Sequence, residues 1–249
     1  MPAYNEEQRL PPTLESVFQH LQGARYDAEI IVVDDGSSDG TADATEVLSR
    51  TNPRLRLIRN PHRGKAYAVR TGVLSSSGQY VLFMDADGAT PIAEVDKLLP
   101  YLEGDYDVAI ASREGLGAQR YDEPVYRHLM GRVFNFVVRA LAVPGIQDTQ
   151  CGFKAFRREA ALDLFANLRL YAHDGGPVQG AVLTAFDVEI LFLARKWGYA
   201  IAEVPVRWYY GDESKVNPVR DSWRNLRDVI RVRWNDVRGR YRRPPSAQD

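Results

Sequence analysis

The sequence has little cysteine, no long apolar segment and almost no net charge. Cys151 is the only cysteine among 249 residues, which excludes an internal disulfide and fits a reducing compartment. No base stands at a spacing that would make its thiol reactive. Nothing approaches the roughly 18 consecutive apolar residues of a membrane-spanning helix, and no signal peptide is found. A formal net charge of −1 gives no reason to expect nucleic acid as a partner. We therefore expect a soluble or peripheral protein.

Apolar strands and amphipathic helices alternate along the chain, and the 45% of hydrophobic residues are enough for one sizeable core. Such alternation indicates an α/β fold, with a mostly parallel sheet covered by helices on both faces. Strands are expected at 29–33, 55–59, 80–84, 107–111 and 201–208. Helices are expected around Leu14–Leu21 and at 42–50, 65–74, 95–102, 126–143, 158–165 and 187–197.

Acidic residues follow two of these strands. Asp85-Ala86-Asp87 comes directly after strand 80–84, and Asp34-Asp35 follows strand 29–33. Open α/β sheets bind ligands at the carboxyl ends of their strands, so Asp85 and Asp87 suggest a metal and a diphosphate, although a solvated turn or helix cap also explains an isolated pair. Ser38 or Asp39 is a candidate helix cap. Adjacent Asp34 and Asp35 are costly to desolvate and instead suggest hydrogen-bonding partners such as a nucleobase imide or ribose hydroxyls.

The second half of the sequence is richer in arginine. The helix at 126–143 carries Arg127, Arg132 and Arg139 among bulky apolar residues, which a buried helix rarely does. Part of it should therefore face something anionic or amphipathic. The glycine-containing loop at 171–184 is either an acceptor lid or an insertion.

The C-terminal segment combines an apolar stripe with a basic one. Between Arg220 and Arg243 there are nine arginines against three aspartates. Two interpretations remain open: a helix packed in the core with a solvated basic face, or an interfacial helix with tryptophans at headgroup depth and arginines on anionic lipid. The apolar stripe consists of Val219, Trp223, Leu226, Ile230, Trp234 and Val237, and the basic one of Arg220, Arg224, Arg227 and Arg231.

Four motifs occur in the order found in family 2 glycosyltransferases of the GT-A fold: residues 2–7 (PAYNEE), 34–41 (DDGSSDGT), Asn60 with 64–66 (GKA), and 85–88 (DADG). Residues 85–90, 148–154 (DTQCGFK), 185–189 (AFDVE) and 214–215 (SK) most resemble the branch that glucosylates dolichyl phosphate and other polyprenyl phosphates. The resemblance runs from Pro2 to about Trp234. It implies a Rossmann-like GT-A domain over 1–215, with a nucleotide-sugar half (1–111) and an acceptor half (112–215), followed by a basic amphipathic C-terminal helix and tail (216–249).

The family usually has an apolar strand directly before the PAYN turn. We therefore expect either that the start is truncated ahead of Met1 or that the fold lacks its first strand.

The resemblance also implies a reaction and its residues. We expect an inverting, metal-dependent transfer of a hexose, glucose by resemblance, from a UDP-sugar to a polyprenyl phosphate, by a peripheral protein at the cytoplasmic face of an anionic membrane. Asp85 and Asp87 would bind Mg²⁺ or Mn²⁺, which prefer oxygen ligands. Lys65 and Lys215 would neutralise the diphosphate, with a surface salt bridge as the alternative for each. The nucleotide-sugar residues would be Pro2, Ala3, Tyr4, Glu6, Asp34, Asp35, Lys65, Asp85, Ala86 and Lys215.

The acceptor side follows from the chemistry of a lipid phosphate, which is already a nucleophilic oxyanion at neutral pH. Positioning and charge neutralisation then matter more than a general base. Arg113, Arg127 and Arg132 are candidates to hold that phosphate, because a guanidinium binds phosphate oxygens bidentately. Among Asp148, Asp187 and Glu189, one acid could act as base or orient an arginine, and helix capping is the alternative for Asp187. The candidate catalytic residues are Asp87, Arg113, Asp148 and Asp187.

Two other functional classes remain. One is a soluble family 2 transferase that acts on a small or polysaccharide acceptor, favoured if the C-terminal helix packs in the core. The other is a non-catalytic protein that binds a nucleotide sugar.

Overall fold

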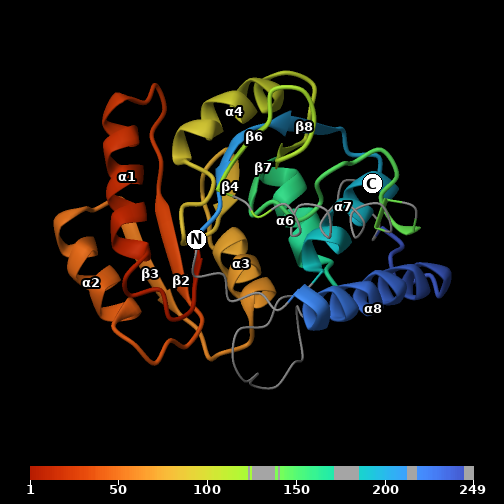
Figure 1. Ribbon diagram of the computed structural model, residues 1–249, viewed down its shortest axis with the longest axis horizontal. Helices are drawn as coiled ribbons and strands as arrows, with labels where there is room; N and C mark the ends of the chain where they lie inside the picture. Colours follow the sequence, from red (N-terminus) through yellow and green to blue (C-terminus); the bar gives the residue numbers. More distant parts are fainter. Residues whose placement is uncertain (123, 125–137, 140, 171–184, 212–217, 244–249) are drawn as a thin grey trace.

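The computed structural model describes residues 1–122, 124, 138–139, 141–170, 185–211 and 218–243, and for residues 218–222 only the backbone. Its strands form three sheets that lie side by side (Figure 1). The first contains β1 (Pro2–Ala3), β2 (Ile30–Asp34) and β3 (Leu55–Arg59), all parallel. Every residue of β2 is buried, in keeping with the β-branched run from which a strand was predicted.

The second sheet has the order β4-β7-β5-β8. Its strands are β4 (Tyr80–Met84), β7 (Phe153–Arg157), β5 (Val108–Ser112) and β8 (Ile201–Pro205). Strand β7 runs antiparallel to both of its neighbours, whereas β5 and β8 are parallel. The sequence analysis missed β7 because Lys154 and Arg157 interrupt its short apolar run.

The third sheet pairs β6 (Gln119–Tyr121) with β9 (Arg207–Tyr209) in parallel. The single strand predicted at 201–208 is therefore two strands. They separate at Val206, whose N–H donates to the carbonyl oxygen of Ser112 at 3.0 Å. The break carries β9 away from β5 and into the pairing with β6.

Helices cover both faces of the sheets, as predicted. The helices α1 (Leu10–Gly23) and α4 (Val95–Glu103), with the 3₁₀ turn η1 (Ile92–Glu94), share one core cluster. The helices α3 (Lys65–Leu74), α6 (Arg158–Ala166), α7 (Phe186–Lys196) and α8 (Pro218–Val237) contribute to another. The helix α2 (Thr41–Thr51) packs beside β3 at the edge of the molecule (Figure 1). The GT-A-type α/β fold expected from the sequence is confirmed.

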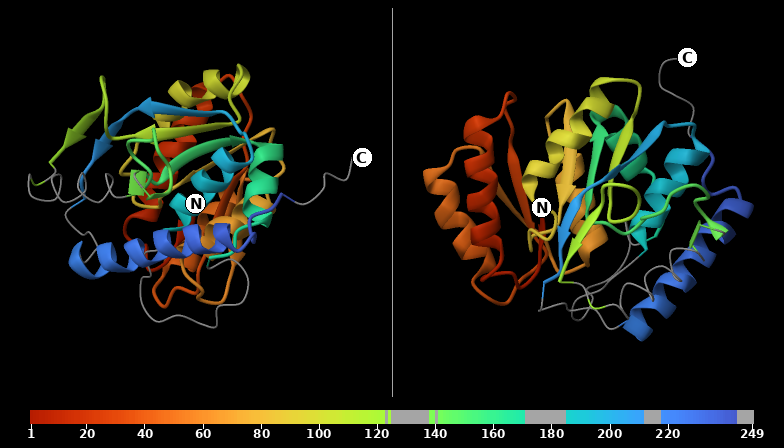
Figure 2. Two further views of the ribbon diagram at one scale, coloured as in Figure 1. Left: turned by 90° about the vertical axis from the view of Figure 1, so that its right-hand side faces the viewer. Right: turned by 45° about the horizontal axis from the view of Figure 1, so that its top comes forward.

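Helix α8 lies along the outer side of the molecule, far from α1 and α2 (Figure 2). It packs against the protein through a face that contains both apolar and polar residues, including Val229 and Val232, which are fully buried. Four residues of the predicted apolar stripe point the other way: Trp223, Ile230, Trp234 and Val237 are 56% to 77% exposed. Leu226, also in the stripe, is half-buried. The helix therefore packs in the core, as one of the two interpretations expects, but through Val229 and Val232 and not through the predicted stripe.

A cavity of about 890 Å³ separates the first sheet from the second. Strand β1 is only two residues long and pairs with Val33 and Asp34, so the parts of β2 and β4 that lie beyond it are not bridged. Apolar residues such as Ile30, Val81 and Phe83 line the cavity.

None of the helices in the described ranges is long and apolar enough to cross a membrane.

Candidate active site

The end of β4 brings together the acids predicted to hold a metal and a lysine from the start of α3. The Nζ of Lys65 lies 2.5 Å from Oδ1 of Asp85. Burial alone would lower the pKa of Lys65, but the carboxylates of Asp85, Asp187 and Asp87 raise it above its usual range. Lys65 is therefore a permanent positive charge among three acids at the carboxyl end of a central strand, where α/β sheets bind their ligands.

Gly152 allows Asp85 to occupy this position. The N–H of Asp85 donates to the carbonyl oxygen of Gly152 at 3.1 Å. A Cβ added to Gly152 would lie 2.1 Å from Oδ2 of Asp85 and 2.4 Å from its Cγ, far inside van der Waals contact. Any larger side chain would displace the Asp85 carboxylate. Gly152 lies within the motif at residues 148–154, but the sequence pattern alone assigns it no role.

The chemistry of Asp85 and Asp87 fits a divalent cation. Desolvation and the neighbouring Asp85 carboxylate raise the pKa of Asp87, so negative charge is concentrated here. Within the described ranges, no cluster of three or more His, Cys, Asp or Glu residues suited to a metal is found. Mg²⁺ needs only one or two protein carboxylates when phosphates and waters complete its coordination shell, and these two oxygen donors suit Mg²⁺ or Mn²⁺.

The two acids after β2 have different surroundings. Both Asp34 and Asp35 are almost fully buried. The carboxylate of Asp35 accepts hydrogen bonds from the backbone N–H groups of Arg63 and Gly64 at 3.0 and 2.7 Å, and it lies 2.8 Å from Nδ1 of His62. Asp35 thus fixes the loop that leads into Lys65. The structure thus shows an internal role for Asp35, and its contact with a base or ribose stays a prediction.

The turn that follows β1 lies against the turn that follows β2. The ring of Tyr4 stacks on His62 with centroids 3.9 Å apart and an interplanar angle of 6°. The N–H of Glu6 donates to Oγ1 of Thr41 at 2.7 Å, and Pro2 and Ala3 form β1 beside Val33 and Asp34. The structure therefore brings Pro2, Ala3, Tyr4, Glu6 and Asp34 into one region.

Of the two candidate caps for helix α2, Asp39 binds its first residue. The Oδ1 of Asp39 accepts a hydrogen bond from the N–H of Thr41 at 3.0 Å. The N–H of Ser38 instead donates to Oδ1 of Asn5 at 2.9 Å, which helps to join the two turns.

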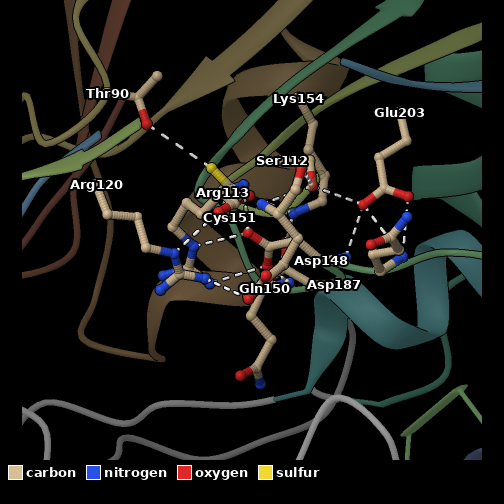
Figure 3. A network of polar contacts seen from close by, with 12 residues as sticks. Thr90, Ser112, Arg113, Arg120, Asp148, Gln150, Cys151, Lys154, Asp187 and Glu203 are labelled. Carbon is tan, nitrogen blue, oxygen red and sulfur yellow. Dashed lines mark hydrogen bonds and ion pairs between the residues drawn. The ribbon is translucent and has the colours of Figure 1, made fainter. Parts of the chain in front are cut away.

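On the other side of β4, Arg113 and Asp148 form a bidentate ion pair, in which the carboxylate is buried and the guanidinium is partly exposed (Figure 3). The Nε and Nη2 of Arg113 donate to the two Asp148 oxygens at 2.7 and 2.9 Å, and the guanidinium lies over the ring of Trp208. Burial raises the pKa of Asp148, but the charge of Arg113 outweighs it and holds that pKa well below the usual range. Of the two roles predicted for Asp148, this geometry favours orienting an arginine over acting as a base.

Supporting contacts fix the loop that carries Asp148. The carboxylate of Glu203 on β8 accepts hydrogen bonds from the N–H groups of Gln147 and Asp148 and from the hydroxyl of Ser112 (Figure 3). Burial raises the pKa of the Cys151 thiol to about 11, which supports the prediction that this thiol is unreactive.

Asp187 pairs with a buried lysine that the sequence analysis missed. The Nζ of Lys154, on β7, donates to Oδ1 of Asp187 at 2.6 Å and to the carbonyl oxygen of Cys151. Lys154 is fully buried and Asp187 is 6% exposed. Asp187 is the second residue of α7 and makes no capping bond. The interpretation of Asp187 as a helix cap is therefore wrong.

Glu189, two residues further along α7, points toward the C-terminal segment. Its Oε1 accepts hydrogen bonds from the hydroxyl of Tyr241 at 2.6 Å and from the N–H of Arg169 at 2.7 Å. Burial raises the pKa of Glu189 to about 7, although these donors oppose the shift. Glu189 thus joins α7 to two other segments and lies apart from the acids at β4.

Three candidate site residues, Arg127, Arg132 and Lys215, lie outside the described residues, as does the loop at 171–184. Their proposed roles stay predictions.

Comparisons with known proteins identify the family of the chain. The family model for glycosyl transferase family 2 matches residues 1–165. The dolichyl-phosphate beta-glucosyltransferase of Dictyostelium discoideum is 36% identical over 96% of this chain and 74% of its own length, and the one from Homo sapiens is 35% identical over 97% and 76%.

Among solved structures, glucosyl-3-phosphoglycerate synthase from Mycobacterium tuberculosis, in complex with Mn²⁺ and UDP-glucose, matches with a TM-score of 0.63 at 21% identity, over 98% of this chain and 78% of that one. The Pyrobaculum calidifontis mannosyltransferase in complex with GDP-Man and Mn²⁺ gives a TM-score of 0.59 at 20% identity, over 95% of this chain and 62% of that one. These two likenesses concern the fold. With the family model matching two thirds of the sequence, the chain belongs to glycosyl transferase family 2 and is a glycosyltransferase.

Proposed function

We propose that this enzyme transfers glucose, with inversion, from UDP-glucose to a polyprenyl phosphate at the cytoplasmic face of a membrane, with Mg²⁺ or Mn²⁺ as cofactor. The observation that carries the proposal is the charge arrangement at the end of β4, where Lys65 lies among Asp85, Asp87 and Asp187. The naming of relatives at 35–36% identity as dolichyl-phosphate beta-glucosyltransferases supports the choice of sugar and acceptor.

The donor would bind across the carboxyl ends of β1, β2 and β4. Pro2, Ala3, Tyr4 and Glu6, with Asp34, are proposed to hold the uridine, and Ala86 is proposed to line the same donor site. Asp85 and Asp87 would hold the cation, whose chemistry is to neutralise charge on the departing UDP. Lys65 would add a second positive charge near the diphosphate oxygens of the departing UDP, and Lys215 is proposed to contribute a further one. Asp35 is proposed to act on the donor through the loop of residues 62–64.

The acceptor would approach from the side of Arg113 and α7. A phosphate oxygen of the lipid attacks the anomeric carbon as the bond to UDP breaks, so UDP leaves with the bonding electrons and the configuration inverts. No proton need be removed from the phosphate oxyanion. Arg113, held in one orientation by Asp148, is proposed to contact that phosphate together with Arg127 and Arg132. Asp187, at the start of α7, is proposed to face the reacting centre.

The test is transfer of label from UDP-[¹⁴C]glucose to polyprenyl phosphate in detergent, with Mg²⁺ or Mn²⁺ and with EDTA. We expect a labelled lipid of β configuration that appears only with the cation. Asp87→Asn should reduce turnover by about 100-fold or more, because charge stabilisation at the leaving group is a large part of such catalysis. Glu103→Gln, a change in an exposed carboxylate at the end of α4, is the matched control and should leave turnover unchanged.

Each part of the proposal has an outcome that contradicts it. Label in a water-soluble product, with none in lipid, would indicate a small or polysaccharide acceptor. Equal turnover by Asp87→Asn and the wild type would remove the metal role. Binding of UDP-glucose without any turnover would indicate a protein that only binds the nucleotide sugar.

A further inference from the structure

Helix α8 presents its largest apolar side chains to solvent. Trp223, Ile230, Trp234 and Val237 are 72%, 56%, 56% and 77% exposed. At about 100° per residue, these four positions fall within about 60° of one another around the helix. Scattered exposed apolar residues are normal on protein surfaces, but a continuous apolar row on one helix face marks an interaction site.

A different face of α8 attaches it to the protein. Val229 and Val232 are fully buried and share a core cluster with residues of α7. Asn225, Asp228 and Asn235 are also at most 9% exposed on this inward side. The outward tryptophans therefore contribute little to packing, and their exposure is a separate feature of the sequence.

Arginines border the outward row. Arg227, Arg231 and Arg238 are all exposed and lie on one flank of the row, at about 40–80° from Trp223 by helical geometry. The guanidinium of Arg238 lies 4.6 Å from the centroid of the Trp234 ring. On the described part of α8, Asp228 is buried and its Oδ1 lies 3.8 Å from Nη1 of Arg231, while Asp236 contacts Lys196 and Arg233. The outward face is therefore both apolar and positively charged.

We propose that this outer face, formed by Trp223, Ile230, Trp234 and Val237 with Arg227, Arg231 and Arg238, docks α8 in the plane of an anionic lipid bilayer. Amphipathic interfacial helices combine tryptophan on the apolar side with arginine at the headgroups. A second copy of the chain is a poorer partner, because it would bring two rows of arginines together. The proposal deepens the proposed function, on which it rests for a reason to be at a membrane.

Docking in this way would bring the site toward the lipid. Helix α8 packs against α7, and packed helices have axes about 8–10 Å apart. Since α7 begins at Phe186 and carries Asp187, a bilayer-bound α8 would hold this acid near the headgroup layer. Figure 2 shows α8 along the outer side of the molecule, with the ends of β6 and β9 directed toward the side where the helix begins.

The experiment is co-sedimentation of the full chain, without substrates, with vesicles of phosphatidylcholine alone or mixed with phosphatidylglycerol. We expect binding to the anionic vesicles, with a blue shift of tryptophan fluorescence and weakening by salt. The double variant Trp223→Ser/Trp234→Ser should bind about 10-fold more weakly or worse, because buried apolar area sets interfacial affinity. Arg227→Gln/Arg238→Gln should lose about 30-fold, at the expected contribution of each arginine near an anionic surface.

Two control variants make the same types of substitution at exposed positions away from α8. Leu116 is fully exposed and Arg54 is an exposed arginine of the first half, so Leu116→Ser and Arg54→Gln should bind as the wild type does. Circular dichroism verifies that every variant folds.

Unchanged binding by either double variant, or equal binding to neutral vesicles, would overturn the proposal. So would a concentration-dependent dimer that Trp223→Ser/Trp234→Ser abolishes, because it would identify the partner as a second copy.

Failure of docking and failure of the proposed reaction can be told apart. Transfer to a short-chain, water-soluble polyprenyl phosphate needs no bilayer, so the α8 variants should retain full turnover there. A protein that binds vesicles but never glucosylates any polyprenyl phosphate would contradict the reaction and leave the docking face in place.

Discussion

The two halves of the candidate site hold their charges in different ways. At the end of β4, the acids Asp85 and Asp87 are nearly adjacent in sequence, and the side chains of Asp85 and Lys65 remain partly exposed, at 34% and 26%. In the second half, the acids are buried and each binds a residue far away along the chain. Asp148 binds Arg113, Asp187 binds Lys154, and Glu189 binds Tyr241, at separations of 35, 33 and 52 residues.

This difference indicates that the charged side chains of the two halves have different functions. A partly exposed charge can exchange its protein partner for a ligand, whereas a buried pair is costly to separate. We therefore infer that the first half supplies the charges that bind the nucleotide, and that the second half uses ion pairs to hold its elements in place. Substitutions at matched positions in the two halves can test this contrast.

The largest effect is expected at the buried pair of Lys154 and Asp187. Lys154→Met leaves the Asp187 carboxylate buried without its partner, and we expect the free energy of unfolding to fall by about 3–5 kcal/mol. The matched change in the first half, Lys65→Met, should cost about 1 kcal/mol or less, because that pair is partly hydrated. Urea denaturation measures both.

Recovery in a double variant provides the control. Lys154→Met/Asp187→Leu removes both charges and should regain most of the lost stability. Equal losses in Lys154→Met and Lys65→Met would contradict the contrast between the halves.

The next effect is a dependence of stability on pH that originates at Glu189. Burial raises its pKa from an ordinary 4.5 to about 7, so the folded protein binds this proton more tightly than the unfolded chain does. The contribution of Glu189 to stability is therefore fully present below about pH 4.5 and is lost as the pH rises toward 7. The size is on the order of 3 kcal/mol.

Glu189→Gln should flatten the stability profile between pH 4.5 and 7 in denaturation experiments. Glu46→Gln, a change in an exposed carboxylate, should leave the slope as in the wild type. An unchanged slope in Glu189→Gln would show that this carboxyl group titrates normally.

Asp148 acts in the opposite direction: its pKa is lowered, so its contribution to stability is present above about pH 3.8 and is lost in more acidic solution.

The same contrast between the two halves explains why the sequence predicts the first half of the site better than the second. The donor acids are contiguous and end apolar strands, so Asp34, Asp85 and Asp87 could be found from local pattern. Lys154 could not be found in this way, because it interrupts an apolar run and its partner lies on another element. The exposure of Trp223 to solvent could not be predicted either, because periodicity defines an apolar stripe but not which side of the helix packs against the core.

A smaller effect, on activity, is expected from Gly152→Ala. The new Cβ would overlap the carboxylate of Asp85, and a displacement of about 1 Å at a reacting group can cost about 100-fold in rate. We expect turnover to fall by about 10- to 100-fold, with weaker binding of Mn²⁺ and UDP in titration calorimetry. Gly23→Ala, at a position with open space for a Cβ, is the control. Wild-type binding of Mn²⁺ by Gly152→Ala would show that Asp85 tolerates the shift.

The smallest effect is expected from an ion pair on the surface of the first half. Nη2 of Arg59 lies 2.8 Å from Glu46, with both side chains about half exposed, at 53% and 52%. Water solvates these charges almost as well when they are separated, so Arg59→Ala should change the free energy of unfolding by less than about 1 kcal/mol in urea denaturation. Its N···O distance is close to the 2.6 Å of the Lys154–Asp187 pair, so the two substitutions compare burial at nearly constant geometry. A loss at Arg59 as large as the one at Lys154 would mean that distance, and not burial, determines what these ion pairs contribute.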